Sequence, residues 1–517
     1  MPRKRKEDPT LRARINRMPD VNDLQRLFEP RTIAFIGAST DIFKWGFNIL
    51  HTIVKRGFAG EVFPVNPKGG EWFGRKMYPS LDEIDKPIDL AAIVVADNLV
   101  LDTVKQCIEK KIPYGIIITA GFSETGPQGA RLEREVVKIA RKGGMRLVGP
   151  NTMGVFSAYP SVMQALMGSM PLTPGGIGLI VQSGNLGSSI SYRFLRRRIG
   201  ISRLISSGNE ADLTLEDFLE YLESDEKTTI ICLYVEGLRQ PRKFFEAARR
   251  ISPKKPILLI KGGRTRRGAV AAMSHTGAMA GNDELFTSMC RQTGIIQLDT
   301  MDEMIDTAGI LMQPMPSGNR VAIITSGGGW GVIATDLCIK NSLAVNPLDP
   351  SLVETLDKIL PRYWSRGNPI DLVAPQRVGV ITDTIIELME HASADAVLLM
   401  GLGYLSLRAH GWLRSSAVPT QAVKQSAEIM IAEETKLFTL IVELIEKYRR
   451  PIIPVFDIMS FDIRMDNNPV TFLDHHGIMP YSAPDKAVFA LARAVKYHQW
   501  VEENINDQSK VSASGRP

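Results

Sequence analysis

Short apolar runs rich in β-branched residues recur along the chain, each followed by a turn of small residues and then by apolar positions at helical spacing. The first third of the chain contains five such runs, at residues 32–36, 61–66, 90–95, 114–119 and 146–148. A helix over residues 46–55 is expected after the first of them. Strands that alternate with helices in this way predict a parallel sheet covered on both faces.

The same pattern restarts twice. After a Pro/Gly-rich stretch at 171–176 it predicts strands at 177–182, 201–206, 229–235 and 256–260, and further on at 321–325, 396–400 and 452–456, with a long helix around 429–448. We therefore expect an α/β protein with three consecutive Rossmann/flavodoxin-like doubly wound parallel-sheet domains, at residues 25–155, 160–312 and 318–495. The polar segments at 1–24 and 496–517 are expected to be tails, the second of them disordered.

Ligands of doubly wound sheets gather at the carboxyl ends of the strands. In the first domain the residues at these ends together provide hydroxyl, amide and ammonium groups; they are Ser39, Thr40, Val65, Asn66, Pro67, Lys68, Ala120, Gly121, Phe122 and Asn151. Such a cleft fits a phosphorylated adenosine better than an apolar substrate. Gly37 and Gly46 stand too far apart for the GxGxxG fingerprint, which disfavours a nicotinamide dinucleotide.

The second domain offers a candidate site for phosphoryl chemistry. Ser183, Gly184 and Asn185 lie between a predicted strand and a helix, where free backbone N–H groups favour an anion. Glu236 ends another strand, and His275 follows a fourth strand by a short basic segment, so both are expected on the same rim. The small residues at 274–281 leave room for an imidazole that accepts a phosphoryl group; the alternative is a histidine buried in a tight loop.

Composition narrows the class of protein. Of the 517 residues 44% are apolar and 23% are charged, as in an ordinary globular protein, and no apolar run approaches the roughly 20 residues that span a bilayer. We therefore expect a cytoplasmic protein without a membrane partner. The four scattered cysteines argue against a disulfide framework or a metal site. Part of the net charge of +6 lies at residues 3–6, which we interpret as a solvated tail and not as a nucleic-acid contact.

An ordered set of motifs gives the chain its family resemblance: GAST at Gly37, VNPK at Val65, TAGFSE at Thr119, GPN at Gly149, QSGN at Gln182, SGNEAD at Ser207, VEG at Val235, SHTGAMAG at Ser274 and NPID at Asn368. Over about residues 25–495 the chain resembles the α subunit of ADP-forming (NDP-forming) acyl-CoA synthetases, or acetate:CoA ligases, which are relatives of succinyl-CoA synthetase. It departs from that family at residues 95–98, at Thr152 and at residues 326–331.

The resemblance implies a role for each matching residue. His275 would carry the phosphoryl group, and Glu236 would hold its imidazole; the alternative for Glu236 is a strand-end carboxylate that caps a turn. Ser183, Gly184 and Asn185 would receive the phosphate. The residues expected to hold CoA are Gly37, Ser39, Thr40, Lys44, Val65, Asn66 and Lys68, with Ala120, Gly121 and Asn151 near its thiol arm or the acyl phosphate.

The resemblance also implies an activity: acyl-CoA + ADP + phosphate would interconvert with carboxylic acid + ATP + CoA through an acyl phosphate and a phosphohistidine. The three domains leave no room for an ATP-grasp domain, so ADP or ATP with Mg²⁺ is expected on a partner β subunit, in an α2β2-type assembly. Two alternatives stay open. One is a regulator that binds CoA or acyl-CoA without catalysis, and the other is a nicotinamide oxidoreductase.

Overall fold

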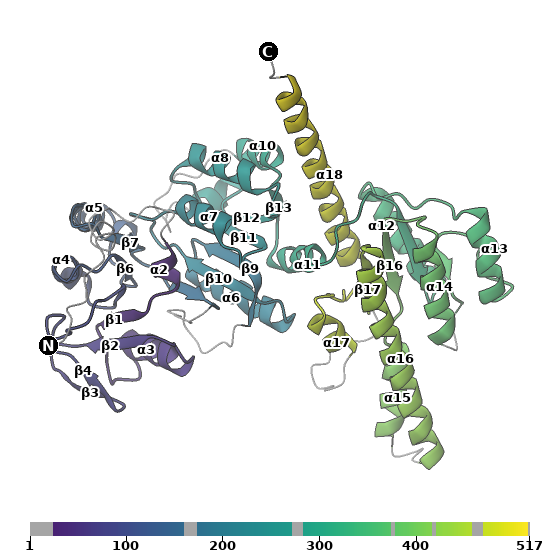
Figure 1. Ribbon diagram of the computed structural model, residues 1–517, viewed down its shortest axis with the longest axis horizontal. Coiled ribbons are helices and arrows are strands. Elements are labelled where there is room, and N and C mark those ends of the chain that lie inside the picture. The colour runs from purple at the N-terminus through teal and green to yellow at the C-terminus, as the bar shows by residue number, and fades with distance from the viewer. Residues whose placement is uncertain are drawn as a thin grey trace, which may run out of the picture. The chain divides into compact units, whose positions relative to one another are not determined.

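The computed structural model describes residues 24–159, 173–270, 283–373, 378–415, 420–456 and 469–514. These form two compact units, which are described separately. The first comprises the chain up to Arg196 together with 200–299, and the second comprises 197–199 together with the chain from Thr300 onward. The first unit contains a five-stranded, a six-stranded and a two-stranded sheet, and the second contains a four-stranded sheet (Figure 1).

The first sheet has the strand order β2-β1-β5-β6-β7, and all its neighbours are parallel. Its strands are β1 (Thr32–Ile36), β2 (Glu61–Val65), β5 (Leu90–Ile93), β6 (Tyr114–Ile117) and β7 (Arg146–Val148). Its helices are α2 (Gln25–Phe28), α3 (Trp45–Lys55), α4 (Asp97–Glu109) and α5 (Pro127–Lys142), with a 3-10 turn η2 (Ser123–Thr125). The sequence did not predict the hairpin β3 (Gly70–Trp72) and β4 (Arg75–Met77) beyond the end of β2.

Both faces of this sheet are buried, because alternate side chains of each strand point to opposite sides. Phe35 of β1 packs in one cluster with Ile49 and Ile53 of α3, whereas its neighbour Ile36 packs in another with Val100 of α4. The doubly wound arrangement predicted from the sequence is therefore confirmed for this part of the chain.

The second sheet has the order β13-β12-β11-β9-β10-β8. Its strands are β8 (Gly154–Ser157), β9 (Pro174–Val181), β10 (Ile201–Ser206), β11 (Ile230–Val235), β12 (Ile257–Lys261) and β13 (Ile296–Leu298), with helices α6 (Gly184–Arg196), α7 (Leu215–Ser224), α8 (Pro241–Ile251) and α10 (Asp283–Thr293). All pairs are parallel except β8, which runs antiparallel to β10 at the edge. The sequence predicted neither β8 nor β13, which have four and three residues and lie at the two edges of the sheet.

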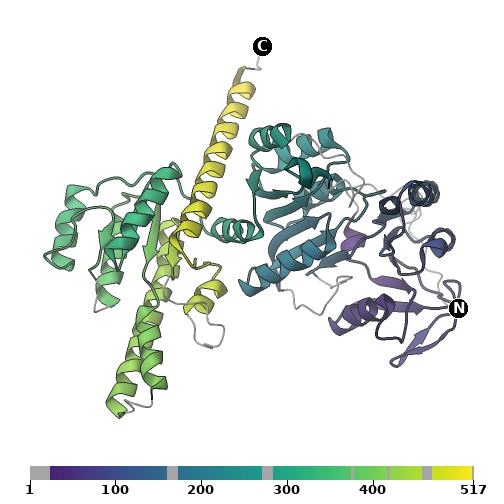
Figure 2. The ribbon, with the colours of Figure 1, turned by 180° about the vertical axis from the view of Figure 1, so that it is seen from behind.

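The second unit contains a parallel sheet in the order β15-β14-β16-β17. Its strands are β14 (Val321–Thr325), β15 (Ile370–Asp371), β16 (Ala396–Met400) and β17 (Ile452–Val455). Its helices are α11 (Met301–Leu311), α12 (Gly328–Lys340), α13 (Pro350–Ile359), α14 (Val378–Glu390), α15 (Tyr404–Arg414), α16 (Gln421–Tyr448), α17 (Pro469–His475) and α18 (Pro484–Ser514). Helix α15 lies alongside the long helix α16 in both ribbon views (Figures 1 and 2).

The prediction of a disordered tail at 496–517 is wrong for most of that segment, because α18 continues as a helix to Ser514. The polar composition of these residues misled the prediction. No proline or glycine occurs between Asp485 and Ser514, so nothing in the backbone ends the helix before that point.

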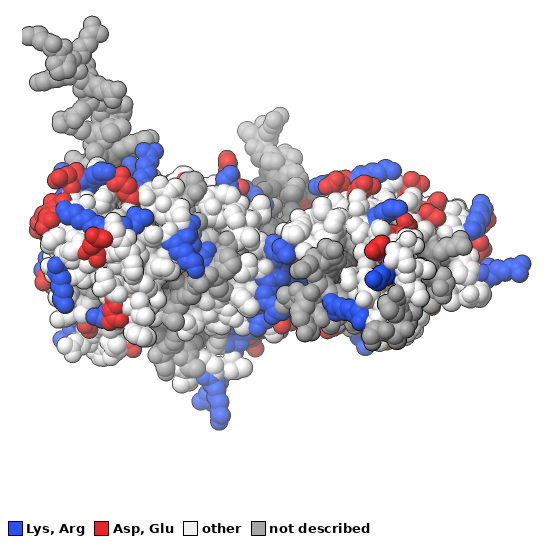
Figure 3. All heavy atoms as spheres, turned by 90° about the horizontal axis from the view of Figure 1, so that it is seen from below, with Lys and Arg blue, Asp and Glu red and all other residues white. Residues whose placement is uncertain are grey.

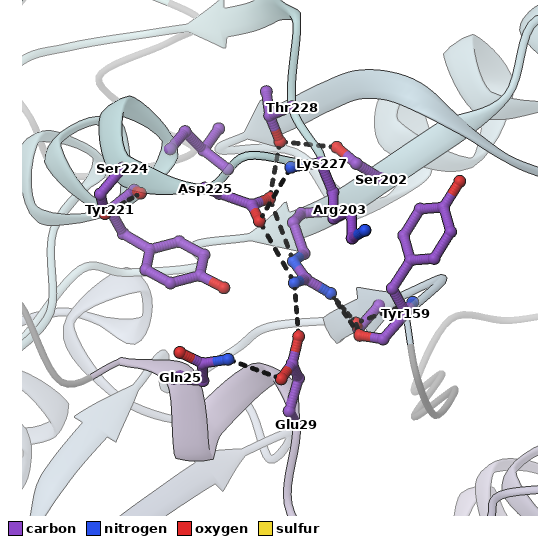
Figure 4. Close-up of polar contacts among 12 residues, drawn as sticks. Gln25, Glu29, Tyr159, Ser202, Arg203, Tyr221, Ser224, Asp225, Lys227 and Thr228 are labelled. Carbon is purple, nitrogen blue, oxygen red and sulfur yellow. Dashed lines mark hydrogen bonds and ion pairs between the residues drawn. The ribbon is translucent and has the colours of Figure 1, made fainter.

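A buried arginine ties α2 to the second sheet within the first unit (Figure 4). The Arg203 guanidinium on β10 donates to Glu29 Oε1 of the N-terminal segment at 2.7 Å and to Asp225 Oδ1 after α7 at 3.3 Å. It also donates to the backbone oxygen of Tyr159 at 2.7 Å and to the Ser157 hydroxyl. Because the Arg203 side chain is only 2% exposed, these contacts compensate a charge that water does not reach.

Candidate functional site

A pocket of about 490 Å³ lies between the strand ends of the first sheet and the start of helix α6. Its walls come from both domains of the first unit. The lining residues are Gly37, Lys44, Trp45, Gly46, Val94, Val95, Ile118, Thr119, Ala120, Asn151, Thr152, Met153, Gln182, Ser183, Gly184, Asn185, Gly208 and Asn209. The volume falls in the range of small-ligand sites, and the wall combines apolar side chains with a few convergent polar groups.

Two glycines shape the first wall. Gly37 has a φ of +100°, and a Cβ at Gly46 would collide with the carbonyl oxygen of Gly37. The start of α3 therefore packs directly against the end of β1, which a larger residue at position 46 would prevent, whereas a Cβ at position 37 would collide with the carbonyl oxygen of Val94. The two glycines that are too far apart in sequence for a dinucleotide fingerprint form this wall together.

The structure brings seven of the predicted site residues to the pocket: Gly37, Lys44, Ala120, Asn151, Ser183, Gly184 and Asn185. Of the other predicted residues within the described part of the chain, Ser39, Thr40, Val65, Asn66, Lys68, Gly121 and Glu236 are not among its lining residues. Val65 and Asn66 instead brace the turn after β1: the carbonyl oxygen of Val65 accepts from the N–H of Gly37 at 3.0 Å, and Asn66 Nδ2 donates to the carbonyl oxygen of Ala38 at 2.7 Å. Phe122 is fully buried in the core, contrary to its expected place in a cleft.

The opposite wall is the start of helix α6. Helix α6 begins at Gly184, where a Cβ would collide with the Met153 side chain, so the helix end and residue 153 are in close contact. The first N–H groups of a helix have no intrahelical acceptor and carry a partial positive charge. In this 13-residue helix they begin at a pocket-lining turn, which is a suitable place for a phosphate.

Asn209 connects the two walls. Its backbone N–H donates to the carbonyl oxygen of Pro150 at 2.9 Å, and its side-chain Oδ1 accepts from Asn151 Nδ2 at 3.3 Å. Its Nδ2 donates to Glu124 Oε2 at 2.5 Å and to Glu133 Oε2 at 2.9 Å, both in the first domain. The SGNEAD motif thus holds the two domains together at the edge of the pocket. Sequence reasoning named this motif but assigned no role to Asn209.

Other lining residues that the sequence analysis missed include Trp45, Thr119, Met153 and Gln182. Gln182 and Thr119 lie inside motifs that were quoted for the resemblance, which was the available signal. Trp45 and Met153 had no such signal, because an apolar residue next to a glycine turn gives no indication of which side it faces.

Glu236 lies at the end of β11 and is 7% exposed. Its backbone N–H donates to Gln182 Oε1, and its carbonyl oxygen accepts from the Lys261 ammonium at 2.7 Å. Burial raises the pKa of Tyr234, and the neighbouring Glu236 carboxylate adds to that effect. Burial lowers the pKa of Lys261, against the opposing influence of Asp283 and Glu236. His275 lies outside the described residues, so its pairing with Glu236 stays a prediction.

Asn368 of the NPID motif has a structural role in the third domain. Asn368 Oδ1 accepts from the N–H of Ile323 at 3.0 Å, and its Nδ2 donates to the carbonyl oxygens of Val321 and Asn346 at 2.9 and 3.1 Å. This side chain therefore joins β14 to the segment before β15. The glycine-rich turn before α12 lies at the carboxyl end of the same strand.

Four further features of the described residues concern metal binding, the membrane, the cysteines and the surface charge. Among the described residues we find no cluster of side chains that could hold a metal ion, and no helix there is both long and apolar enough to cross a membrane. All four cysteines are buried as free thiols. On the face in Figure 3, basic and acidic side chains are interspersed among uncharged ones.

The chain matches three domain families in order. Residues 31–158 match the CoA binding domain, residues 174–311 the succinyl-CoA ligase like flavodoxin domain, and residues 321–407 the Ligase-CoA domain. The sheets and the pocket between the first two matched segments therefore define a protein assembled from the domains of CoA ligases.

Two similar proteins and one solved structure indicate which kind of CoA ligase the chain is related to. The α subunit of acetate–CoA ligase (ADP-forming) II from Pyrococcus furiosus is 40% identical over 72% of this chain and 81% of its own length. The α subunit of acetate–CoA ligase (ADP-forming) I from the same organism is 34% identical over 92% and 98%. A structure of the dinucleotide-forming acetyl-coenzyme A synthetase 1 of Ca. Korarchaeum cryptofilum, in complex with phosphate and ADP, superposes with a TM-score of 0.81 at 30% identity, covering 94% of this chain and 99% of that one.

The chain belongs to the family of α subunits of ADP-forming acyl-CoA ligases. This membership confirms the resemblance read from the motifs and the predicted fold class. It favours an acid–thiol ligase over the non-catalytic regulator that the sequence had left open.

Proposed function

We propose that the protein is the α subunit of an acid:CoA ligase (ADP-forming), which interconverts acyl-CoA + ADP + phosphate and carboxylic acid + ATP + CoA. The observation that carries the proposal is the pocket that joins the strand ends of the CoA-binding domain to the start of helix α6. A thioester and a phosphate have to meet for the first step, and this pocket offers one wall suited to each.

The first step takes place in that pocket. The thioester end of acyl-CoA lies against the wall of Gly37, Ala120 and Asn151, and phosphate lies at the start of α6, beside Ser183 and Asn185. A phosphate oxygen attacks the carbonyl carbon, the carbon–sulfur bond breaks, and CoA leaves as the thiol or thiolate. A helix N-terminus stabilises an anion by about 0.3–1 kcal/mol when exposed and by up to about 2 when partly buried, so several backbone N–H groups can retain the acyl phosphate.

The second step moves the phosphoryl group to His275. A ring nitrogen attacks phosphorus, the phosphorus–oxygen bond breaks, and the carboxylate leaves. Glu236 bonds the other ring nitrogen, which fixes the tautomer and keeps the carboxylate away from the phosphate. The Glu236 N–H donates to Gln182 Oε1, and the Glu236 carbonyl oxygen accepts from the Lys261 ammonium. These two bonds support the role of Glu236, because they fix the point from which its side chain extends.

The third step requires a second polypeptide. An ATP-grasp β subunit, in an α2β2-type assembly, holds ADP with Mg²⁺, and a nucleotide oxygen takes the phosphoryl group from His275 to form ATP. The name "subunit alpha" of the two Pyrococcus furiosus relatives supports a partner of this kind. In this scheme residues 25–155 bind CoA, 160–312 carry the phosphohistidine and 318–495 form the third ligase domain, and the assembly acts in the cytoplasm.

The proposal is tested with the complex purified from cells that co-express the chain and its ATP-grasp partner. The complex receives ADP, phosphate, Mg²⁺ and a panel of aliphatic, branched and aryl acyl-CoA thioesters. We expect ATP and free CoA thiol to form in equal amounts with at least one thioester, and we expect His275→Asn to abolish both products. Binding of acyl-CoA without ATP formation from any thioester would instead identify the non-catalytic regulator.

A further inference from the structure

The side chain of Gln182 uses its full hydrogen-bonding capacity at the end of β9. Its Oε1 accepts from the N–H groups of Glu236 and Gly237, the second at 3.0 Å. Its Nε2 donates to the carbonyl oxygen of Gly237 at 2.6 Å and to Glu210 Oε1 at 3.0 Å. A glutamine amide offers two N–H donors and one oxygen with two lone pairs, so all four are satisfied.

These bonds connect three parts of the proposed site. Gln182 immediately precedes Ser183, where the phosphate-binding turn begins. Its amide spans the Glu236–Gly237 turn, which carries the proposed catalytic carboxylate. The side chain is 8% exposed, and its backbone N–H donates to the carbonyl oxygen of Tyr234 on the neighbouring strand at 3.2 Å. One side chain therefore links the start of α6 to the end of β11.

Glu210 accepts one of the two hydrogen bonds that Gln182 Nε2 donates. It is 5% exposed, adopts a left-handed φ of 55°, and its Oε1 also accepts from the Ser207 hydroxyl at 2.7 Å. Its segment is fixed to the first domain, because the N–H of Ala211 donates to the carbonyl oxygen of Gly149 at 3.1 Å. Burial raises the pKa of Glu210 to about 7, which agrees with a carboxyl group held in a dry position.

We propose that Gln182 is the positioning residue for Glu236, and that Glu210 fixes the orientation of its amide. The inference rests on the proposed function, in which Glu236 orients the phosphoryl-accepting imidazole. Without the two bonds from Gln182 Nε2, the Glu236–Gly237 turn loses one of its anchors. A displacement of a catalytic group by about 1 Å can cost about a hundredfold in rate.

Three variants separate positioning from general stability. Gln182→Glu keeps the size of the side chain and an oxygen that accepts from the N–H groups of Glu236 and Gly237. It removes both N–H donors and places a second carboxylate against Glu210. Glu210→Gln keeps a side-chain oxygen that accepts from Gln182, so it tests the charge of Glu210 alone. The matched control is Glu246→Gln on α8, at a side chain that is 58% exposed. The double variant Gln182→Glu/Glu210→Gln exchanges the two groups, so that the amide of residue 210 donates to the carboxylate of residue 182.

The experiment measures two quantities in the complex with the ATP-grasp partner: the rate of histidine phosphorylation from [γ-³²P]ATP, and the dissociation constant for CoA. We expect Gln182→Glu to slow phosphorylation by about tenfold to a hundredfold, with CoA affinity within about twofold of wild type. We expect the double variant, which restores the contact between residues 182 and 210 but not the bond to the Gly237 carbonyl oxygen, to recover part of the rate. We expect Glu210→Gln to slow phosphorylation less than Gln182→Glu does, and the control Glu246→Gln to match wild type.

Three results would overturn the positioning role. They are phosphorylation of Gln182→Glu at the wild-type rate, an equal loss of CoA binding, which would show a general effect on the pocket that Gln182 lines, and a double variant as slow as Gln182→Glu. A wild-type complex that takes no label at all would overturn the proposed function and this inference with it. A labelled wild type with an equally labelled Gln182→Glu would overturn the inference alone.

Discussion

The buried Arg203 network offers a sharp test of what holds the first unit together (Figure 4). The change is Arg203→Met, which conserves most of the volume of the side chain but removes its charge and its donors. Glu29 and Asp225 then lose their common partner, and the carbonyl oxygen of Tyr159 loses a donor. We expect the first unit to be substantially less stable.

The magnitude follows from the exposure of the side chains left behind. Removing one partner of a buried ion pair costs about 3–5 kcal/mol. The Asp225 side chain is 6% exposed and that of Glu29 is 20%, so water can reach part of Glu29. Asp225 also keeps a bond from the Thr228 hydroxyl at 2.8 Å. Both facts place the expected loss near the lower end, at about 3 kcal/mol.

Hydrogen exchange of peptides from β9 and β10, followed by mass spectrometry, measures this loss locally. A loss of about 3 kcal/mol corresponds to exchange roughly a hundredfold faster. The matched control is Arg242→Met, which breaks a pair with Glu246 between side chains that are 93% and 58% exposed and should change stability little. If Arg203→Met speeds exchange no more than the control does, the network does not stabilise this unit as argued.

Two further predictions concern charge. Burial raises the pKa of Glu210 from 4.5 to about 7, so the native state keeps this proton to a higher pH than the unfolded state, and stability should fall as pH rises through that window. Glu210→Gln should reduce this decline by about 3 kcal/mol. The free energy of unfolding measured at pH 5 and at pH 8 tests this, and an unchanged dependence on pH would contradict it. Lys44 lines the pocket, so Lys44→Ala should raise the KM for CoA about fivefold, leave kcat nearly unchanged and weaken the salt dependence of KM. The control is Lys105→Ala, whose ammonium already pairs with Asp102; it should change neither KM nor its salt dependence.

The sequence predicted the sheets best where apolar β-branched runs are long. The strands expected at 201–206, 321–325 and 396–400 have those bounds in the structure. The edge strand Gly154–Ser157 was missed, because four residues carry little periodicity and are held in place mainly by their neighbour β10. The length of α18 was missed because polarity was taken as a sign of disorder, although the segment has no helix-breaking residue.

The candidate site was predictable at its turns and not at its polar connections. Ser183–Asn185 and Gly37 were predicted because small residues between a strand and a helix indicate a ligand site, and in the structure they line the pocket. Gln182 and Asn209 were not assigned roles. The function of an amide side chain depends on which groups the fold brings to it, and here those groups are 28 to 85 positions away.

In the proposed function, an imidazole at position 275 carries phosphate between this chain and a nucleotide site on a partner. The most direct measurement is to incubate the complex with [γ-³²P]ATP and to locate the label by mass spectrometry under alkaline conditions, which preserve phosphohistidine. We expect one acid-labile phosphoryl group on His275, absent from His275→Asn and retained in His391→Asn. Acid-labile label that persists in His275→Asn, or a wild-type chain that takes none, would contradict it.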